Sequence, residues 1–443
     1  MRRRSRAAFC TPATAHSAIR PKMSGGRGKI RAMKILHTSD WHLGRGLGNY
    51  DLFQDQDKAI TFIVDEAIKR EVDVVVVAGD VFDRGTPPPV SIRLLNAALT
   101  RLYEAGIVSI ITAGNHDSAD RLSAYANLLK ENVYIWGSIS DTGKPIILKD
   151  GHGDVAFYPL TFLFPDQSIE TFASLGQGEV ARSHQAVHEH AMSLVRADLK
   201  ARKTNRSVVI SHSFVTTYGT KKKREFVDGI EVENDATVSE SERDISVGGV
   251  QTVTADTFDG ATYVALGHLH GPQKIAAQKS KAVLRYSGSP IKYSLSEKNH
   301  NKSFVVVSIG ADSVITDKDI EIVPIPQTRG MSTVQATCAE ILSGKFESKK
   351  DDFVELIITD EELDAIELAK ARTYFPYVLS TNTKSFNVSR LQDFAGVDTQ
   401  NLSDMELIAQ FFDKVAGKKL QGADLKTIEA VYEEVRNSQE VSQ

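Results

Sequence analysis

Short apolar runs recur along the first two-thirds of the chain, and each has the length of a buried β-strand. The run over 72–77 holds five valines, a composition typical of parallel strands that are covered on both faces. Between the first runs, apolar residues such as Ile60 and Ile63 recur at helical spacing. The alternation over 33–136 predicts a parallel α/β layer with right-handed connections, including a helix over 120–130.

Residues 145–330 carry mostly short strands, interrupted by one helical segment at 184–203. The strands at 283–286 and 304–309 are predicted to belong to a second sheet, stacked on the first. The polar, turn-rich stretch at 216–250 is predicted to be a long loop, and long loops in compact domains are usually functional or mobile. The hydrophobic pattern therefore favours two stacked sheets flanked by helices.

The pattern changes again near residue 325. Residues 331–400 read as helix, strand, helix, strand, which predicts a small separate α/β unit. Two helices are predicted beyond residue 400, and Ser403 with Glu406 forms a capping-box pattern at the start of the first. The chain is predicted to divide into a disordered basic extension (1–32), a main domain (33–325), a small domain (326–400) and C-terminal helices (401–443).

Five of the predicted strands are each followed by side chains that bind divalent metal ions. In open α/β sheets, ligands sit beyond the carboxyl ends of the strands, so these stretches are expected to converge in space. Their carboxylate, amide and imidazole donors suit manganese, iron or zinc. The side chains are Asp40 and His42, Asp80, Asn115 and His116, His212, and His268 and His270.

Three of the residues in these stretches predict chemistry as well as binding. Asp80 follows the most hydrophobic strand, where a carboxylate is costly unless it is paired or bound to metal. A carboxylate shared by two ions is how two-metal hydrolases clamp a phosphoester. The imidazole of His116 could protonate a leaving alkoxide near neutral pH, with Asp117 orienting its ring.

Charge is distributed unevenly along the chain. Residues 1–32 contain nine Lys or Arg and no Asp or Glu, whereas the whole chain carries −4, so residues 33–443 carry −13. This negative charge is unexpected for a protein that binds nucleic acid by itself. Bound divalent ions or a basic partner would compensate for the negative charge. One basic run in the predicted loop is either a solvated surface or a contact for a phosphate backbone: Lys221, Lys222, Lys223 and Arg224.

Cysteine content and hydropathy indicate the compartment. Cys10 and Cys338 are far apart and form no disulfide framework, which favours a reducing, intracellular location. No apolar run reaches the ~18–20 residues of a membrane helix, so no membrane contact is expected. The basic extension is read as a disordered tail or a start assigned too far upstream, with an organelle transit peptide as the alternative.

The order of the strand-end motifs resembles that of the calcineurin-like metallophosphoesterases. Over residues 33 to about 436, the sequence resembles one group within this superfamily more specifically. That group is the SbcD family, the nuclease subunits of bacterial SbcCD complexes. The likeness is specific over 33–300 and looser beyond. The motifs that carry it are 37–44, 79–88, 114–117, His212, 265–270 and 285–290.

This resemblance implies the fold and the ligand set. The fold class would be α/β: a two-sheet calcineurin-like sandwich flanked by helices, then a small α/β DNA-capping domain and C-terminal helices for partner binding. Two manganese ions are implied, although other divalent ions are possible. The first ion would take Asp40, His42, Asp80 and His270, and the second would take Asp80, Asn115, His212 and His268.

The resemblance also implies the activity and the partners. His116 matches the catalytic histidine of a metal-dependent DNA nuclease, with 3'-5' exonuclease action on duplex ends and endonuclease action on hairpins or single strands. Archaeal relatives place a histidine three residues after the shared aspartate, where this chain has Asp83. The implied partners are DNA, a second copy of the chain and an SbcC-like SMC-type ATPase. The implied setting is DNA repair, replication and recombination in the bacterial cytoplasm, at the nucleoid.

Two other functions are compatible with parts of the pattern. A small-substrate metallophosphodiesterase, acting for example on cyclic nucleotides, would need the donors but neither the small domain nor the C-terminal helices. A non-catalytic scaffold for an ATPase would not need an intact donor set. Turnover of a DNA hairpin against a small phosphodiester, and the metal content, discriminate among the three.

Overall fold

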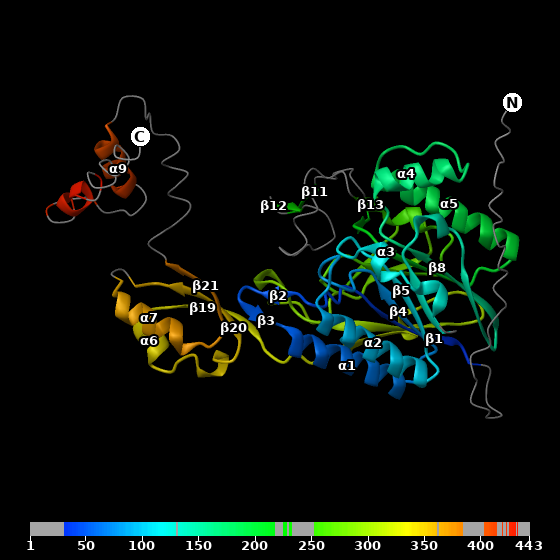
Figure 1. Cartoon of the computed structure of the whole chain (residues 1–443), viewed down its shortest axis with the longest axis horizontal. Coiled ribbons are helices and arrows are strands. Elements are labelled where there is room, and N and C mark those ends of the chain that lie inside the picture. Colours follow the sequence, from blue (N-terminus) through cyan, green and yellow to red (C-terminus); the bar gives the residue numbers. More distant parts are fainter. Residues whose placement is uncertain are drawn as a thin grey trace, which may run out of the picture. The chain divides into compact units, whose positions relative to one another are not determined.

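The computed structural model places two compact units along the chain, Met1–Thr328 and Arg329–Gln443 (Figure 1). No helix in the described parts of either unit is both long and apolar enough to cross a membrane. The structure describes residues 31–129, 132–217, 225–227, 230–232, 252–360, 363–383, 403–413, 419, 422, 425–430 and 432.

The first sheet has six strands in the order β18-β17-β1-β4-β5-β6. Four of its strands are parallel, as the sequence predicts, and β17 and β18 continue the sheet in antiparallel fashion beside β1. The strands are β1 Met33–Thr38, β4 Val74–Ala78, β5 Val108–Thr112, β6 Val133–Trp136, β17 Ser303–Ile309 and β18 Ile320–Pro324.

The second sheet also has six strands, in the order β15-β16-β14-β9-β8-β7. Its four inner strands are parallel, and β7 and β15 form antiparallel edges. The strands are β7 Ile146–Asp150, β8 Gly153–Leu160, β9 Ser207–His212, β14 Tyr263–Gly267, β15 Gln273–Ile275 and β16 Val283–Tyr286.

The two sheets pack face to face through a shared hydrophobic core. Ile35 and Val76 of the first sheet and Phe157 and Ile210 of the second belong to this core, and each is fully buried. Alternate residues of each strand point into it, because side chains alternate between the faces of a strand. The predicted two-sheet sandwich is therefore confirmed.

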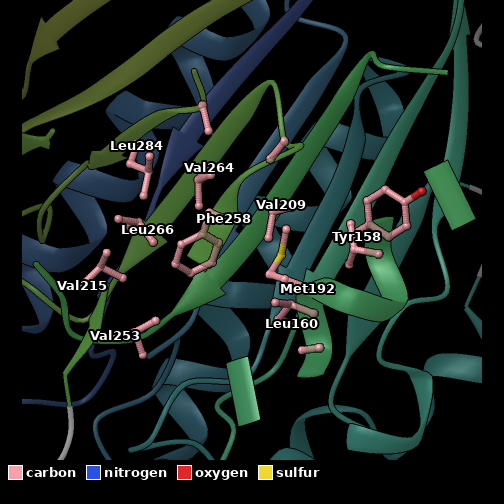
Figure 2. Packing of buried hydrophobic residues seen from close by; sticks show 14 of the residues in the cluster. Tyr158, Leu160, Met192, Val209, Val215, Val253, Phe258, Val264, Leu266 and Leu284 are labelled. Carbon is pink, nitrogen blue, oxygen red and sulfur yellow. The ribbon is translucent and has the colours of Figure 1, made fainter. Parts of the chain in front are cut away.

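Helices cover the outer faces of both sheets. On the first sheet, the ring of Phe62 in α1 lies 6.4 Å from that of Phe304 in β17. On the second sheet, Met192 of α5 and Phe258 pack on Val209 and other strand residues, and Figure 2 shows part of this cluster. The helices are α1 Phe53–Lys69, α2 Pro89–Glu104, α4 Pro165–Ser174 and α5 His184–Arg202.

Short elements complete the first unit. Three two-stranded ladders are β2 Gly46–Leu47 with β3 Tyr50–Asp51, β10 Val215–Thr216 with β13 Val253–Thr254, and β11 Glu225–Val227 with β12 Ile230–Val232. The single turns are α3 Ala119–Leu122, η1 Ala126–Leu128, η2 Ile139–Asp141, η4 Ala255–Phe258, η5 Leu295–Glu297 and η6 Asp317–Asp319.

The second unit contains a three-stranded parallel sheet with helices. Its core includes Val334, Ile341, Leu356 and Ala371, all buried. The predicted capping box is confirmed, because Ser403 Oγ accepts the N–H of Glu406 at 3.3 Å and the Glu406 carboxylate accepts the N–H of Ser403 at 2.8 Å. The elements are β19 Met331–Ala336, α6 Cys338–Leu342, η7 Glu347–Lys349, β20 Phe353–Ile358, α7 Ala365–Tyr374, β21 Val378–Thr383 and α9 Asp404–Phe411.

Several local predictions are wrong. The strand at 304–309 lies in the first sheet, not the second; its residues are buried on both faces, so its sequence does not indicate its partner. Where one helix was predicted from residue 120, the described residues form only α3 and η1. Neither element contains a buried residue, and Leu128 is exposed, so no buried face supports a longer helix. Strand β19 and helix α4 were missed, and the predicted loop at 216–250 contains the β11–β12 hairpin.

Candidate metal centre

Five strand ends from both sheets meet at one end of the sandwich. Within the first sheet, the N–H of Asp40 donates to the carbonyl of Gly79 at 3.1 Å. Between the sheets, His212 Nδ1 donates to the carbonyl of Ala78 at 2.9 Å, and the N–H of His268 donates to Asp40 Oδ1 at 2.9 Å. The predicted donors are therefore brought together, although they come from positions far apart in sequence.

The backbone at these strand ends is strained. Eight described non-glycine residues have a positive φ, and four of them are predicted donors. Such conformations cost about 1–3 kcal/mol each and persist where the surrounding structure enforces them, often at functional sites. The four are Asp40 (φ 54°), His42 (42°), Asp80 (49°) and His268 (107°).

The first donor group consists of Asp40, His42 and His270, whose ligand atoms all lie within 4.8 Å of one another. The Nε2 atoms of the two histidines face each other at 3.1 Å, and Asp80 Oδ2 lies 3.5 Å from His42 Nε2. Two ring nitrogens lie this close when a proton or a cation sits between their lone pairs. Burial lowers the pKa of His42 to about 4, so near neutral pH this ring is neutral and can donate a lone pair.

The second donor group consists of Asp80, Asn115, His212 and His268. Asn115 Oδ1 lies 3.0 Å from His212 Nε2 and 3.2 Å from His268 Nδ1. Asp80 Oδ2 lies 3.2 Å from His212 Nε2. Because His212 Nδ1 is bonded to a backbone carbonyl, Nε2 is the nitrogen that faces this group. The carboxylate of Asp80 therefore borders both groups.

The electrostatics of the cluster favour a bound cation. Burial opposes a charge on His212, but the carboxylates of Asp80 and Asp40 outweigh it and raise the pKa of His212 to about 9. The carboxylates thus attract positive charge strongly at this position. A divalent ion would balance the negative charge of these carboxylates in the same way. The mixture of carboxylate, amide and neutral imidazole donors is typical of sites for such ions. The residues present therefore fit two divalent ions that share Asp80.

A buried ion pair, which the sequence did not reveal, holds His270 on the side of its ring away from the other donors. Lys302 Nζ donates to Glu297 Oε2 at 2.6 Å and to the carbonyl of His270 at 2.9 Å, and both charged side chains are fully buried. Glu297 Oε1 accepts the Nδ1–H of His270 at 3.0 Å. A carboxylate behind a metal-binding histidine fixes the tautomer of the ring and raises its basicity. In sequence, 297–302 reads only as a polar loop.

The ring of His116 stands at the edge of the first donor group, with its centroid 4.8 Å from that of His42. Its Nδ1–H donates to the backbone carbonyl of Asp83 at 3.0 Å, which leaves Nε2 for other chemistry. The prediction that Asp117 orients this ring is wrong, because the carbonyl of Asp83 does so.

Asp117 instead ties two of the strand-end loops together. Its carboxylate accepts backbone N–H groups from Val81 (3.1 Å), Phe82 (2.9 Å) and Gly114 (2.9 Å). Burial and the charge of nearby Asp80 raise the pKa of Asp117 to about 6. Asp117 therefore acts on the backbone that positions Asp80.

Two glycines are required by the close packing of these loops. A Cβ added at Gly114 would lie 2.1 Å from Asp80 Oδ1, and one added at Gly79 would lie 2.3 Å from His212 Nδ1. Gly79 also has a φ of 81°, which favours glycine. The Gly-Asp and Gly-Asn-His-Asp motifs thus have a packing reason beside their chemistry.

The predicted basic run lies elsewhere in the chain. Lys221, Lys222, Lys223 and Arg224 fall outside the described residues, so their predicted contact with a phosphate backbone stays a prediction.

Comparison with known families agrees with the fold and the donor set. A family model described as calcineurin-like phosphoesterase matches residues 33–272, a span that contains all five donor-bearing strand ends. The two-sheet fold and the paired donor groups define a metal-dependent phosphoesterase. The chain belongs to the calcineurin-like phosphoesterase family.

One curated relative is similar over nearly its full length. The chain is 28% identical over 410 residues to the SbcD subunit of the nuclease SbcCD from Staphylococcus saprophyticus, covering 90% of this chain and 97% of the relative. Two solved structures are also similar. Each match covers 67% of this chain and 100% of the solved chain. They are a protein from Thermus thermophilus (13% identity, TM-score 0.36) and a dimetal phosphatase from Danio rerio (12%, TM-score 0.37).

Proposed function

We propose that this protein is a manganese-dependent DNA nuclease of the SbcD type, which cleaves duplex ends with 3'-5' polarity and opens hairpins and single strands endonucleolytically. The convergence of eight side chains from five strand ends on one acidic, histidine-rich centre carries the proposal. It is supported by the near full-length similarity to a curated nuclease subunit.

The donors would hold two ions at the centre. Asp40, His42, Asp80 and His270 would bind the first, and Asp80, Asn115, His212 and His268 would bind the second. When bound, the ions would neutralise charge on the phosphodiester and lower the pKa of a water molecule. The remaining catalytic work falls to the side chains of the chain itself.

His116 is the proton donor of the proposed reaction. Water adds to phosphorus and loses a proton to the solvent, the bond to the leaving oxygen breaks, and His116 Nε2 gives its proton to that oxygen and later regains one from the solvent. Because Nδ1–H stays bonded to the carbonyl of Asp83, the ring keeps its orientation as the proton leaves Nε2. Asp117 contributes indirectly, since it holds the backbone beside Asp80.

The rest of the chain is proposed to adapt this centre to DNA. Residues 326–400 would form a DNA-capping domain, and 401–443 would dock on the coiled coil of an SbcC-like SMC-type ATPase through the apolar side chains of their helices. The described part of that C-terminal region includes α9, whose Asp404 bonds to the hydroxyl of Tyr432. Action on DNA would place the protein in the cytoplasm at the nucleoid, in repair, replication and recombination.

A substrate comparison tests the proposal. Purified full-length protein is assayed with a labelled DNA hairpin and with bis(p-nitrophenyl) phosphate, in manganese or magnesium, with and without the ATPase. We expect manganese-dependent opening of the hairpin, enhanced by the ATPase with ATP. Turnover of the small diester without any cleavage of DNA would instead establish a small-substrate phosphodiesterase, and turnover of neither would favour a scaffold.

We further propose that the protein forms a homodimer through residues 119–129, which follow His116 in the chain and contain α3 and η1. Tyr125 and Leu128 are 73% and 81% exposed there, which is unusual for large apolar side chains placed so close together. Leu128→Glu should therefore convert a dimer into a monomer of 48.6 kDa in light scattering. Val314→Glu, at a site 59% exposed elsewhere, should leave the dimer intact. A dimer that persists in Leu128→Glu would contradict this interface.

A further inference from the structure

Asp83 places a negative charge at the edge of the candidate centre. Its carboxylate is 19% exposed, and its Oδ1 lies 3.5 Å from His42 Nδ1. Its backbone carbonyl holds the ring of His116. A phosphodiester that approaches His116 would therefore meet a carboxylate of like charge, which opposes binding unless a cation stands beside it.

Arg45 supplies that cation. Its Nη1 lies 3.5 Å from Asp83 Oδ1, and its side chain is 20% exposed. The guanidinium carbon lies 5.4 Å from the centre of the Tyr293 ring, in the geometry of a cation–π contact. The ring of Tyr293 is itself fixed, since it is buried and its hydroxyl donates to the carbonyl of Trp41.

The backbone also holds Arg45 close to the donors. The N–H of Arg45 donates to the carbonyl of His42 at 2.9 Å, in a tight turn between β1 and β2. That carbonyl also accepts a bond from the Gln56 amide at 2.8 Å. The backbone of Arg45 is therefore fixed beside His42, and the contacts with Asp83 and Tyr293 limit the rotamer freedom that the side chain would lose on binding a ligand.

Most of the hydrogen-bonding capacity of Arg45 is open. Among the described residues, the contact with Asp83 is the one side-chain hydrogen bond of its guanidinium, and at 3.5 Å it is long. A guanidinium has five N–H donors in a planar fork that matches two oxygens of a phosphate. A partly exposed, pre-positioned fork beside a catalytic histidine is suited to an anionic diester.

We infer that Arg45 is a positioning residue that binds a backbone phosphate of the substrate strand and offsets the charge of Asp83 at the entrance to the centre. This inference rests on the proposed nuclease function and deepens it. It also accounts for how a phosphate is held in a chain that has an aspartate, rather than a histidine, at position 83.

Steady-state kinetics and binding by the full-length protein with manganese test the inference. Arg45→Ala should raise KM for a DNA hairpin by about tenfold or more, because a charge-assisted hydrogen bond is lost, and should change kcat less. In the His116→Ala background, where cleavage is expected to be slow, Arg45→Ala should make the oligonucleotide affinity measured by anisotropy depend less steeply on salt. The slope against log salt should fall by about 0.7–0.9, the value of one phosphate contact.

Two further variants make the test specific. Arg45→Lys keeps the charge but not the fork, so it should recover part of the lost affinity. Arg101→Ala also removes an arginine paired with a carboxylate, that of Asp65, but on the distant helix α2, and should match the unmodified protein. If Arg45→Ala raises KM equally for the hairpin and for bis(p-nitrophenyl) phosphate, Arg45 binds the scissile phosphate. If KM rises only for DNA, Arg45 binds a neighbouring phosphate of the strand.

The outcomes separate this inference from the proposed function. If the unmodified protein cleaves the hairpin and Arg45→Ala leaves both KM and the salt slope unchanged, Arg45 does not bind phosphate. The inference also fails if Arg45→Ala lowers the manganese content, because Arg45 would then act on the structure of the centre. If the unmodified protein cleaves no DNA at all, the nuclease proposal itself fails.

Discussion

Replacing Asp80 with alanine will abolish metal-dependent phosphodiester cleavage and strongly reduce the stabilisation of the fold by manganese. The Asp80 carboxylate borders both donor groups, with His42 Nε2 at 3.5 Å and His212 Nε2 at 3.2 Å. Its loss removes a ligand from each ion and the charge that attracts them. A ligand that binds only the folded state raises the melting temperature, so manganese should raise it for the unmodified protein and much less for Asp80→Ala.

His116→Ala is the matched control for this prediction. It should retain the manganese-dependent rise in melting temperature and two bound ions by elemental analysis, because His116 is not among the proposed ligands. Its cleavage rate should nevertheless fall by about 10²–10⁴-fold, the usual contribution of a general acid. Full manganese-dependent cleavage by either variant would contradict the roles given to these residues.

The second large effect is expected at the buried ion pair behind the centre. Burial opposes a charge on Glu297, but Lys302 and the ring of His270 outweigh it and hold the pKa of Glu297 well below its usual range. Lys302→Ala would therefore leave a buried carboxyl group without its charged partner. Breaking such a pair by removing one partner costs about 3–5 kcal/mol. The loss of stability is measured as the change in the free energy of unfolding of the first unit, obtained by urea titration. Lys281→Ala, which removes an exposed lysine, should lie within about 0.5 kcal/mol of the unmodified protein.

A double variant distinguishes charge from packing at this pair. With Lys302→Met and Glu297→Gln together, no charge remains buried and the glutamine oxygen can still accept the Nδ1–H of His270. This protein should be more stable than Lys302→Ala. Its manganese affinity should still be reduced by about 10–100-fold, because a neutral amide raises the basicity of His270 less than a carboxylate does. Equal stability of the single and double variants would show that lost contacts, not the unpaired charge, cause the defect.

The centre was more predictable from sequence than its surroundings, for reasons visible in particular residues. Asp80 and Asn115 each follow an apolar strand in a short motif, so their type, spacing and strand end could be read locally. Glu297 and Lys302 could not, because they lie in a polar segment with no periodic pattern and their burial depends on tertiary contacts such as those with His270 and Ser289. The proposed role of Arg45 could not be predicted either, because it depends on contacts with Asp83 and Tyr293, which are distant in the chain.

The sequence by itself determined the five strands that carry the donors, that two sheets and flanking helices form, and which side chains stand at those strand ends. These features follow from local periodicity and from the rule that ligands gather beyond the carboxyl ends of parallel strands. Only the tertiary structure decided that β17 joins the first sheet, that the Asp83 carbonyl orients His116, and that a buried ion pair supports His270. Each of these depends on contacts between distant residues, whose energies no local pattern encodes.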